Sequence, residues 1–438
     1  MRRLFLIHPT LLASGLALLL SLAGETVHAQ TSLPLQECIT QALVSSPRLQ
    51  VAKSQLEASE SVAQASRGQR LPSVAASGNL NYVSELQSLD IAPNPALPTG
   101  MSFTFGDNLS YSLSLGVRAP LYAGGSLVSQ ERAYLYEASA SQRDFAADSL
   151  TVLYEVRSAY YRALAAAEAN RLTKNALDRL LRHQKDVENM QQAGMADEET
   201  LLTLLSHIRE AEQTVASVEA GFRSAQLELG RVIGRAGEEI TANGGLSVSL
   251  DASVTTRDVE TRPDLEAFDL RAESASRRVH AAKGSYLPTV SAMAAFNYGK
   301  PGVNYIQNEW MSYATAGISL NWTVFDWSVR KHTVQSVRSS RQKLLESKRA
   351  VAEMWQTRQA AAQARLESAR RERTAAESRL ELERKRYHLV EGKRTQGQAS
   401  ERDLLDAQDD LSSAEIGLAQ ALAQERLAET ELLYALGR

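Results

Sequence analysis

Residues 397–437 read GQASERDLLDAQDDLSSAEIGLAQALAQERLAETELLYALG. Leucine recurs every seven residues, with one interruption at Glu425, at Leu404, Leu411, Leu418 and Leu432. Alanine follows three residues after each heptad position, at Ala407, Ala414, Ala421, Ala428 and Ala435. Apolar residues at this spacing line one side of a helix and pack as alternating large and small knobs in a coiled coil. The stretch therefore predicts a helix that pairs with another helix.

The same pattern occurs earlier in the chain. Gly194 takes the place of Gly397, and apolar residues follow in the same register at Leu201, Ile208, Val215, Phe222 and Leu229. A Leu-Pro dipeptide at residue 71 likewise recurs at residue 287. A repeat of this size indicates duplication of a domain-scale unit. We therefore divide the chain into a first repeat at residues 30–234, a linker at 235–262 and a second repeat at 263–438.

Long tracts without proline predict helices. No proline occurs from residue 121 to residue 262, or after Pro301, and these tracts are rich in Ala, Leu, Glu, Gln and Arg, which enter helices at little cost. We predict helices at residues 35–67, 125–190 and 197–232, with counterparts in the second repeat. The longest would extend about 100 Å. Two shorter helices placed end to end match that length, which predicts a rod of parallel helices.

Four segments between the helices alternate apolar with small or polar residues and predict β-strands, at residues 73–82, 109–119, 290–298 and 314–322. Tilted strands of about ten residues can cross a bilayer. A soluble β-sandwich alternates in the same way, but aromatic residues gather near the strand ends, as in an interfacial girdle: Tyr82, Tyr122, Tyr298, Trp310, Tyr313, Trp322, Phe325 and Trp327. Four strands cannot close a barrel, and lipid does not tolerate open edges, so the pattern predicts an oligomer. Loops rich in proline or glycine join the strands of each pair, the first at residues 83–108.

The amino terminus has the features of a signal peptide. Arg2 and Arg3 precede an apolar run at residues 4–22, and small residues precede residue 30, which predicts a signal peptide at residues 1–29. A transmembrane anchor is the alternative, against which the short apolar run argues. Because Cys38 is the only cysteine, an internal disulfide is excluded. We expect Cys38 to be buried on a helix. A formal charge of −3 argues against nucleic-acid binding.

Motifs for catalysis or cofactor binding are missing from the sequence. It contains no Gly-rich phosphate loop, no GxSxG and no HExxH motif, each of which has a defined chemical role. The histidines after the signal peptide lack ligand spacing, and we expect them on helix surfaces: His183, His207, His280, His332 and His388. The sequence therefore predicts neither an enzyme nor a protein with a metal ion or cofactor.

These features together resemble the TolC-type family of outer-membrane efflux proteins, over essentially the whole chain after the signal peptide. The shared features are the duplicated order of helix, strand, strand, helix, helix, and the segments ALVSSP at residue 42, PLYAGG at residue 120 and DLLDAQ at residue 403. The resemblance implies a mainly α fold with membrane β-strands, in which two helical coiled-coil hairpins and two β-hairpins per chain build a homotrimer. Its twelve-stranded barrel would lie in outer-membrane lipid and continue as a helical tunnel through the periplasm. A periplasmic adaptor protein and an inner-membrane transporter of the RND or ABC class are the implied partners.

The resemblance also assigns roles to the tips of the helical hairpins. In the family these tips dock the adaptor, which implicates Ala193, Gly194, Met195, Gly397 and Gln398. Glycine permits the tight turn between antiparallel helices. A plain turn role for the two glycines is the alternative.

Two acidic residues beyond the second tip match the family's gate positions. Asp403 and Asp406 lie three residues apart on one helix face, and a trimer would place six such carboxylates around one constriction. The alternative is that they are ordinary solvated acids. Two positions that help to tie the closed tip in some relatives differ here, because Arg394 and Ala399 stand where those relatives have Tyr and Arg. Other ties could come from Asp197, Glu198, Glu401 and Arg402.

The sequence and the resemblance together predict a passive exit duct in the outer membrane, with no reaction of its own. We expect the loop at residues 83–108 to face the cell exterior and the helical tips to reach into the periplasm. The alternative function is a periplasmic coiled-coil adaptor or scaffold, which also has helical hairpins; the two-faced strand pairs argue against it. The identity of the exported substrate is not indicated by the sequence.

Overall fold

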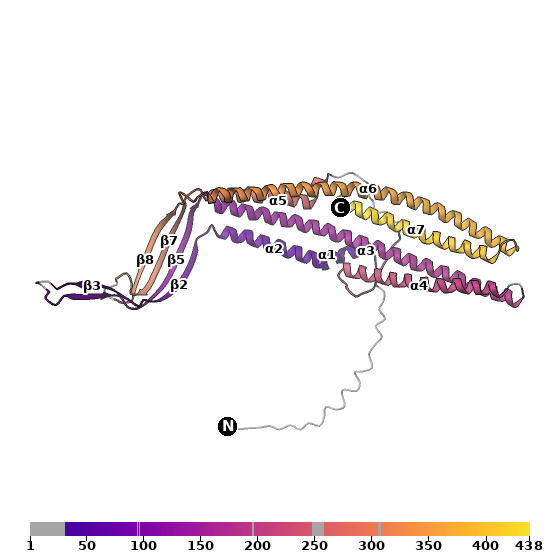
Figure 1. Cartoon of the computed structure of the whole chain (residues 1–438), viewed down its shortest axis with the longest axis horizontal. Coiled ribbons are helices and arrows are strands. Elements are labelled where there is room, and N and C mark those ends of the chain that lie inside the picture. The colour runs from indigo at the N-terminus through magenta and orange to yellow at the C-terminus, as the bar shows by residue number, and fades with distance from the viewer. Residues whose placement is uncertain (1–30, 94, 96, 195–196, 248–257, 305–307) are drawn as a thin grey trace, which may run out of the picture.

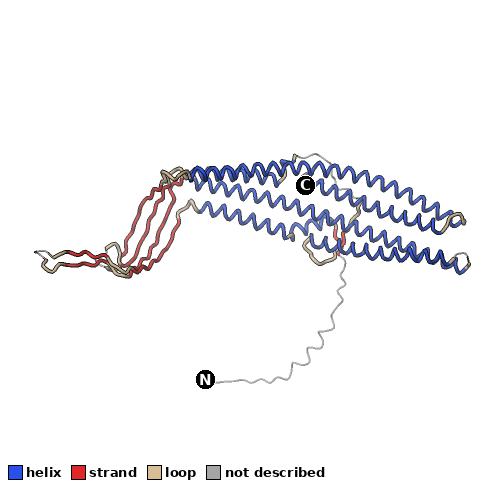
Figure 2. The backbone as a smooth tube through the Cα atoms, viewed as in Figure 1, coloured by secondary structure: helices blue, strands red, loops and turns tan. Residues whose placement is uncertain are grey.

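The computed structural model describes residues 31–93, 95, 97–194, 197–247, 258–304 and 308–438. The molecule is elongated, with a β-sheet towards one end and helices along the rest of its length (Figure 1, Figure 2). Within the described ranges, no helix is both long and apolar enough to cross a membrane. The predicted signal peptide at residues 1–29 lies outside the described residues.

Seven α-helices occur within the described residues: α1 (Leu35–Ser45), α2 (Pro47–Gly68), α3 (Ser126–Gln192), α4 (Glu198–Val232), α5 (Pro263–Gly284), α6 (Val329–Thr395) and α7 (Glu401–Ala435). The predicted helices at 125–190 and 197–232 correspond to α3 and α4. The single helix predicted at 35–67 was wrong, because the chain breaks it into α1 and α2. Ser46 between them has an extended backbone with φ −60° and ψ 120°. The residue before a proline is sterically driven out of the helical region, and Pro47 then starts the next helix.

The long helices α3 and α6 form the length of the rod. Each has 67 residues, which corresponds to about 100 Å. Helix α2 packs along the half of α3 near the strands, and α4 packs along the other half (Figure 1). In the same way, α5 packs along the half of α6 near the strands, and α7 packs along the other half. This arrangement confirms the predicted rod of parallel helices.

The main sheet has four strands in the order β2-β5-β7-β8, and all neighbouring pairs are antiparallel. Their bounds are β2 (Ser73–Tyr82), β5 (Leu109–Ala123), β7 (Thr289–Lys300) and β8 (Met311–Asn321). These are the four strands that the sequence predicts. The order helix, strand, strand, helix, helix therefore occurs twice, first as α2, β2, β5, α3, α4 and then as α5, β7, β8, α6, α7.

One face of this sheet is apolar and exposed. Leu115 is paired with Phe296, and Ile318 with Ala292, and directly paired residues share a face. The large side chains on this face are exposed to solvent: Val74, Leu80, Tyr82, Leu113, Leu115, Val117, Phe296, Tyr298, Ile318 and Leu320. The opposite face carries small and polar residues such as Ser112, Ser114 and Asn297. Among the residues that the structure describes, no other segment covers the apolar face of this sheet.

The segment after β2 holds a second, smaller hairpin. The sequence predicts a plain loop at residues 83–108, but β3 (Gln87–Ile91) and β4 (Met101–Phe105) pair there in antiparallel register. Leu89 lies opposite Phe103, so an apolar cross-strand pair helps to hold the hairpin. The hairpin projects from the end of the main sheet that is far from the helices (Figure 1). The loop prediction was therefore wrong for these ten residues.

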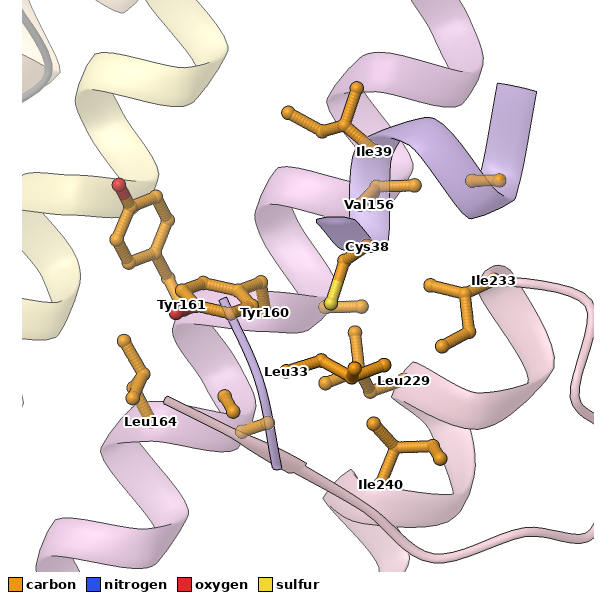
Figure 3. Close-up of a cluster of buried hydrophobic side chains, with 14 of the residues drawn as sticks. Leu33, Cys38, Ile39, Val156, Tyr160, Tyr161, Leu164, Leu229, Ile233 and Ile240 are labelled. Carbon is orange, nitrogen blue, oxygen red and sulfur yellow. The ribbon is translucent and has the colours of Figure 1, made fainter. Parts of the chain in front are cut away.

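A compact core lies near the middle of the helical part. Strand β1 (Thr31–Leu33) pairs in parallel with β6 (Ile240–Ala242), which joins the chain before α1 to the linker. Figure 3 shows Cys38 and Leu33 among Val156, Leu229 and Ile240, so α1, α3, α4 and both strands contribute to one cluster. Cys38 is fully buried on α1, as the sequence predicts. The linker residues 248–257 lie outside the described range.

The interruption of the heptad at Glu425 has a structural cause. The Glu425 side chain is only 4% exposed and lies 3.2 Å from Arg373 and 3.1 Å from Arg426. Arg370 on α6 is also within 3.6 Å. A buried carboxylate is costly unless it is paired. An ion network therefore replaces leucine at this position, between α6 and α7.

Candidate functional site at the helical tips

Both helical hairpins turn at glycine residues. Gly194 has φ 70° and Gly397 has φ 72°, a backbone conformation that other residues adopt only with strain. The Gly194 N–H donates to the Gln191 carbonyl and the Gly397 N–H to the Arg394 carbonyl, each at 2.9 Å. The two turns lie at the same end of the molecule, far from the sheet (Figure 1). Of the predicted docking residues, Ala193, Gly194, Gly397 and Gln398 are exposed, and Met195 lies outside the described residues.

Side chains just after each turn cap the next helix. The Asp197 carboxylate accepts a hydrogen bond from the Thr200 N–H at 2.9 Å. At the second tip, Ser400 Oγ accepts from the Asp403 N–H at 3.2 Å, and the Asp403 carboxylate accepts from the Ser400 N–H at 2.9 Å. This reciprocal pair is a capping box. The hydrogen bonds from Ser400 hold the pKa of Asp403 below its ordinary value.

The two predicted gate residues lie on the first turns of α7. Asp403 and Asp406 are both exposed, while Leu404 and Leu405 beside them are buried. Asp403 therefore has a capping role in the single chain, through its Oδ2 atom. The structure brings neither residue into an ion pair among the described residues. Their assignment to a gate stays a prediction.

A partly buried polar cluster joins the two hairpins just behind the tips. Glu401 on α7 contacts His183 on α3, and Arg394 on α6 donates to Glu401 at 2.7 Å. The side chains of His183, Arg394 and Glu401 are only 8%, 19% and 17% exposed. Arg394 also lies 3.6 Å from the sulfur of Met190 on α3. We call His183, Arg394 and Glu401 the tip cluster.

Burial and the neighbouring charges together determine the protonation state of His183. Burial lowers the pKa of His183 below its ordinary value, Glu401 and Asp186 oppose that shift, and Arg394 adds to it. The positive charge of Arg394 already satisfies Glu401. His183 is therefore neutral at neutral pH and can donate one N–H to the Glu401 carboxylate. The tip cluster then carries one cation and one anion.

Further contacts hold the hairpins together along α3 and α7. Arg179 donates to Ser412 at 2.8 Å and to Glu415 at 3.1 Å, and His207 on α4 lies 3.4 Å from Asp409. Between these polar contacts lies an apolar cluster formed by Leu180, Val187, Leu204, Ile208 and Leu405. The two hairpins therefore form one packed unit within the chain.

Sequence reasoning missed part of this site. The prediction that all histidines lie on helix surfaces was wrong for His183, which is 7% exposed. A signal was present, because Leu180, His183 and Val187 follow the helical spacing of three and four residues. Glu401, one of the residues that could tie the tip, accepts a hydrogen bond from Arg394, which the sequence identified only as a departure from some relatives; that this contact holds the channel closed stays a prediction. The position of His183 on the apolar stripe of α3 therefore predicts its burial better than its residue type does.

Comparison with known proteins gives a family match. The family described as "Outer membrane efflux protein" matches residues 38–235 and 258–438. These two ranges include the first repeat from residue 38 onwards, the whole second repeat, and all seven helices described above except the first residues of α1.

Relatives and solved structures agree with this match. Toxin and drug export protein A of Aggregatibacter actinomycetemcomitans is 23% identical over 243 residues, which is 52% of this chain and 50% of that protein. The match thus spans about half the length of that relative. The Neisseria gonorrhoeae MtrE outer membrane channel in its open state has a TM-score of 0.76 at 20% identity, over 92% of this chain and 88% of that chain. The outer membrane protein VceC of Vibrio cholerae has a TM-score of 0.73 at 16% identity, over 92% and 96% of the two chains. These similarities show that the fold is shared.

Proposed function

The chain belongs to the outer membrane efflux protein family, and from this premise we propose that it is an outer-membrane exit duct. This is a family of transport conduits and not of enzymes. The duct would carry small molecules or polypeptides out of the cell without a reaction of its own. Energy and substrate choice would come from an inner-membrane transporter of the RND or ABC class, linked through a periplasmic adaptor.

The observation that carries this proposal is the two-faced sheet. Its four strands leave β2 and β8 as edges, and its apolar face is exposed in the single chain. Open edges and uncovered backbone groups are excluded from lipid, so membrane insertion requires closure with other copies. Three copies would supply twelve strands and a closed barrel. A soluble adaptor or scaffold would gain nothing from such a face, which argues against the alternative function.

The helical part supports a tunnel through the periplasm. Helices α3 and α6 leave the sheet in the same direction and end at the tips (Figure 1), about 100 Å away at the helical rise. The exposed tip residues Ala193, Gly194, Gly397 and Gln398 would then meet the adaptor. Drugs or toxins are candidate cargo, because the relative from Aggregatibacter actinomycetemcomitans is named as an exporter of both.

Orientation and assembly can be tested together. A cysteine at Ser88, which is exposed in the β3–β4 hairpin, should react with a membrane-impermeant thiol reagent in intact cells, and a cysteine at Gln191 near the tip should not. Burial raises the pKa of the native Cys38 to about 11, so that thiol should stay silent. The protein should also run as a heat-resistant trimer from outer-membrane fractions. Labelling at Gln191 but not at Ser88, or release of the protein as a soluble periplasmic species, would contradict the proposal.

We propose that Asp403 and Asp406 line the narrowest point of the tunnel. Carboxylates gathered in a constriction attract cations and repel one another. In a planar bilayer, the Asp403→Asn, Asp406→Asn double variant should lose cation selectivity and block by trivalent cations. Asparagine at position 403 keeps a side-chain oxygen that can accept from the Ser400 N–H, so trimer stability should change little. The matched control is Asp197→Asn, which changes a capping carboxylate at the other tip. Unchanged selectivity in the double variant would place the constriction elsewhere.

A further inference from the structure

The β3–β4 hairpin has two unlike faces. Directly paired residues of antiparallel strands lie on one face, and successive pairs alternate between the two faces. One face carries apolar side chains, with Gln87 at its base: Leu89, Ile91, Met101, Phe103 and Phe105. The other face is polar and consists of the pairs Ser88–Thr104 and Asp90–Ser102. We call the five apolar residues the apolar hairpin face.

The apolar hairpin face has no cover in the single chain. Leu89, Met101 and Phe103 are exposed at 53%, 43% and 43%. Among the residues that the structure describes, the two strands of this hairpin pack on each other and on no further helix or strand. A two-stranded hairpin alone in water is marginally stable at best, and contiguous exposed apolar side chains mark a site of interaction. The face therefore needs a partner.

The base of the hairpin is fixed to the main sheet. The Val83 N–H donates to the Asn108 carbonyl at 2.8 Å, and the Asn108 side-chain amide donates to the Val83 carbonyl at 2.7 Å. Lys300 at the end of β7 lies 3.9 Å from the carboxylate of Asp107. From this base the hairpin points away from the helices, roughly along the line of the rod (Figure 1). The fold therefore places the apolar hairpin face beyond the end of the main sheet.

The charges of this segment favour another copy of the hairpin as the partner. Residues 83–108 contain Glu85, Asp90 and Asp107 but no lysine or arginine, whereas surfaces that bind membranes carry basic residues that attract anionic lipids. Asp90 is the one charged residue in β3 and β4, and it lies on the polar face. Identical apolar faces can therefore meet without the high cost of burying an unpaired charge.

Each chain contributes one such hairpin at a defined place. Residues 83–108 join β2 to β5, whereas β7 and β8 are joined by the much shorter segment 301–310. The hairpin continues from β2, which is an edge strand of the main sheet and must join a neighbouring copy in a closed barrel. Identical chains around a symmetry axis present identical surfaces to one another. Three copies would therefore gather three apolar hairpin faces at the outer end of the barrel.

We propose that the apolar hairpin faces of three chains pack against one another over the outer mouth of the duct and form a cap. The proposal rests on the proposed function, because it requires three copies and an outward-facing hairpin. The cap restricts the entry of large molecules from outside, and cargo separates the hairpins as it leaves. Each chain buries a small apolar area in the cap, so the cap can open without disturbing the barrel.

Cross-linking at two neighbouring positions tests which face of the hairpin meets another copy. In a Cys38→Ser background, Leu89→Cys lies on the apolar hairpin face and Ser88→Cys on the polar face. Mild oxidation of intact cells should link chains pairwise in Leu89→Cys. Ser88→Cys should stay unlinked and should react with a small membrane-impermeant thiol reagent.

Equal cross-linking of the two variants would overturn the cap, and so would rapid labelling of Leu89→Cys without cross-links. Protection of Leu89→Cys without cross-links would overturn it as well, because a different partner would then cover the face. A lack of labelling at Ser88→Cys would instead contradict the orientation on which the proposed function depends.

Access to the inside of the barrel gives a second, independent test. Asn79→Cys, again in the Cys38→Ser background, lies on the polar face of the main sheet, which faces the inside of a closed barrel. Adding Phe103→Asp should open the cap and speed its labelling in intact cells by a large maleimide–polyethylene glycol at least about tenfold, which corresponds to a loss of about 1.4 kcal/mol in the free energy of closing. Thr104→Asp, on the polar hairpin face, is the matched control and should leave the rate unchanged.

Equal rates with the large reagent in the Phe103→Asp and Thr104→Asp variants would overturn the cap. A small maleimide should label Asn79→Cys at the same rate in every variant, since it passes the hairpins in either state. If the small reagent fails to label this site in all of them, the barrel itself is contradicted, and with it the proposed function.

Discussion

Replacing Glu401 by glutamine is expected to loosen the contact between the two helical hairpins at the tips. Glu401 accepts from Arg394 at 2.7 Å and contacts His183, and all three side chains are less than one fifth exposed. Hydrogen bonds to charged groups contribute about 1.5–3 kcal/mol. Glutamine keeps the shape but leaves the Arg394 charge without its carboxylate. We therefore expect a loss of about 2 kcal/mol, which is roughly a 25-fold shift towards the opened tip.

Hydrogen exchange followed by mass spectrometry can measure this shift on the purified full chain. Amides on both sides of the tip cluster, near His183 and near Glu401, should exchange faster in the variant by about the factor above, since local opening limits their exchange. Asp410→Asn is the matched control. It breaks the Arg386–Asp410 pair, which is more exposed and lies within the second hairpin, so it should leave exchange on α3 unchanged.

The reasoning is refuted if Glu401→Gln leaves exchange on α3 at the wild-type rate, or if Asp410→Asn has an equal effect. A double-mutant cycle with Arg394→Gln gives a second check. The two substitutions remove one shared interaction, so their effects should fall well short of additive. Additive effects would mean that the tip cluster does not couple the hairpins.

Three further predictions concern pH, the buried ion network and a glycine. Burial lowers the pKa of His183 below its ordinary value of 6.5, so His183 binds a proton more strongly when the tip is open than when it is closed. The tip contact should therefore be strongest at neutral pH and weaken as the pH falls below 6.5. In His183→Gln, hydrogen exchange at the tip should keep only the pH dependence of the exchange chemistry itself. Glu425→Leu would restore the heptad leucine yet remove the carboxylate that Arg370, Arg373 and Arg426 share; because the buried Arg426 keeps its pair with Glu429, thermal denaturation should show a loss of about 2 kcal/mol. Gly124→Ala should destabilise the protein by more than about 2 kcal/mol, because the added Cβ atom would meet the Gly284 carbonyl oxygen. The control Gly125→Ala has a similar φ of 74° but open space around the added Cβ atom, and should cost only about 1 kcal/mol. Equal melting temperatures for the two variants would contradict this prediction.

The amino-acid sequence by itself determined the elements and their duplication. The heptads at residues 397–437, the proline-free tracts and the alternating strands predicted α3, α4 and all four strands of the main sheet. Gly194 and Gly397 marked the two tips correctly. These features are local: a periodicity of 3.5 or 2 shows which side of an element is apolar without reference to the rest of the chain.

Only the tertiary structure decided which residues meet across that apolar side. It placed His183 of the first repeat against Glu401 of the second, and it showed that Glu425 interrupts the heptad because arginines surround it. It also showed Gly124 pressed against Gly284 while Trp327, its equivalent, is left exposed. The two repeats have nearly the same local pattern, yet their neighbours differ. A residue's partner depends on contacts between distant segments, and the energy of a buried charge or a strained backbone is set by those contacts and not by local sequence.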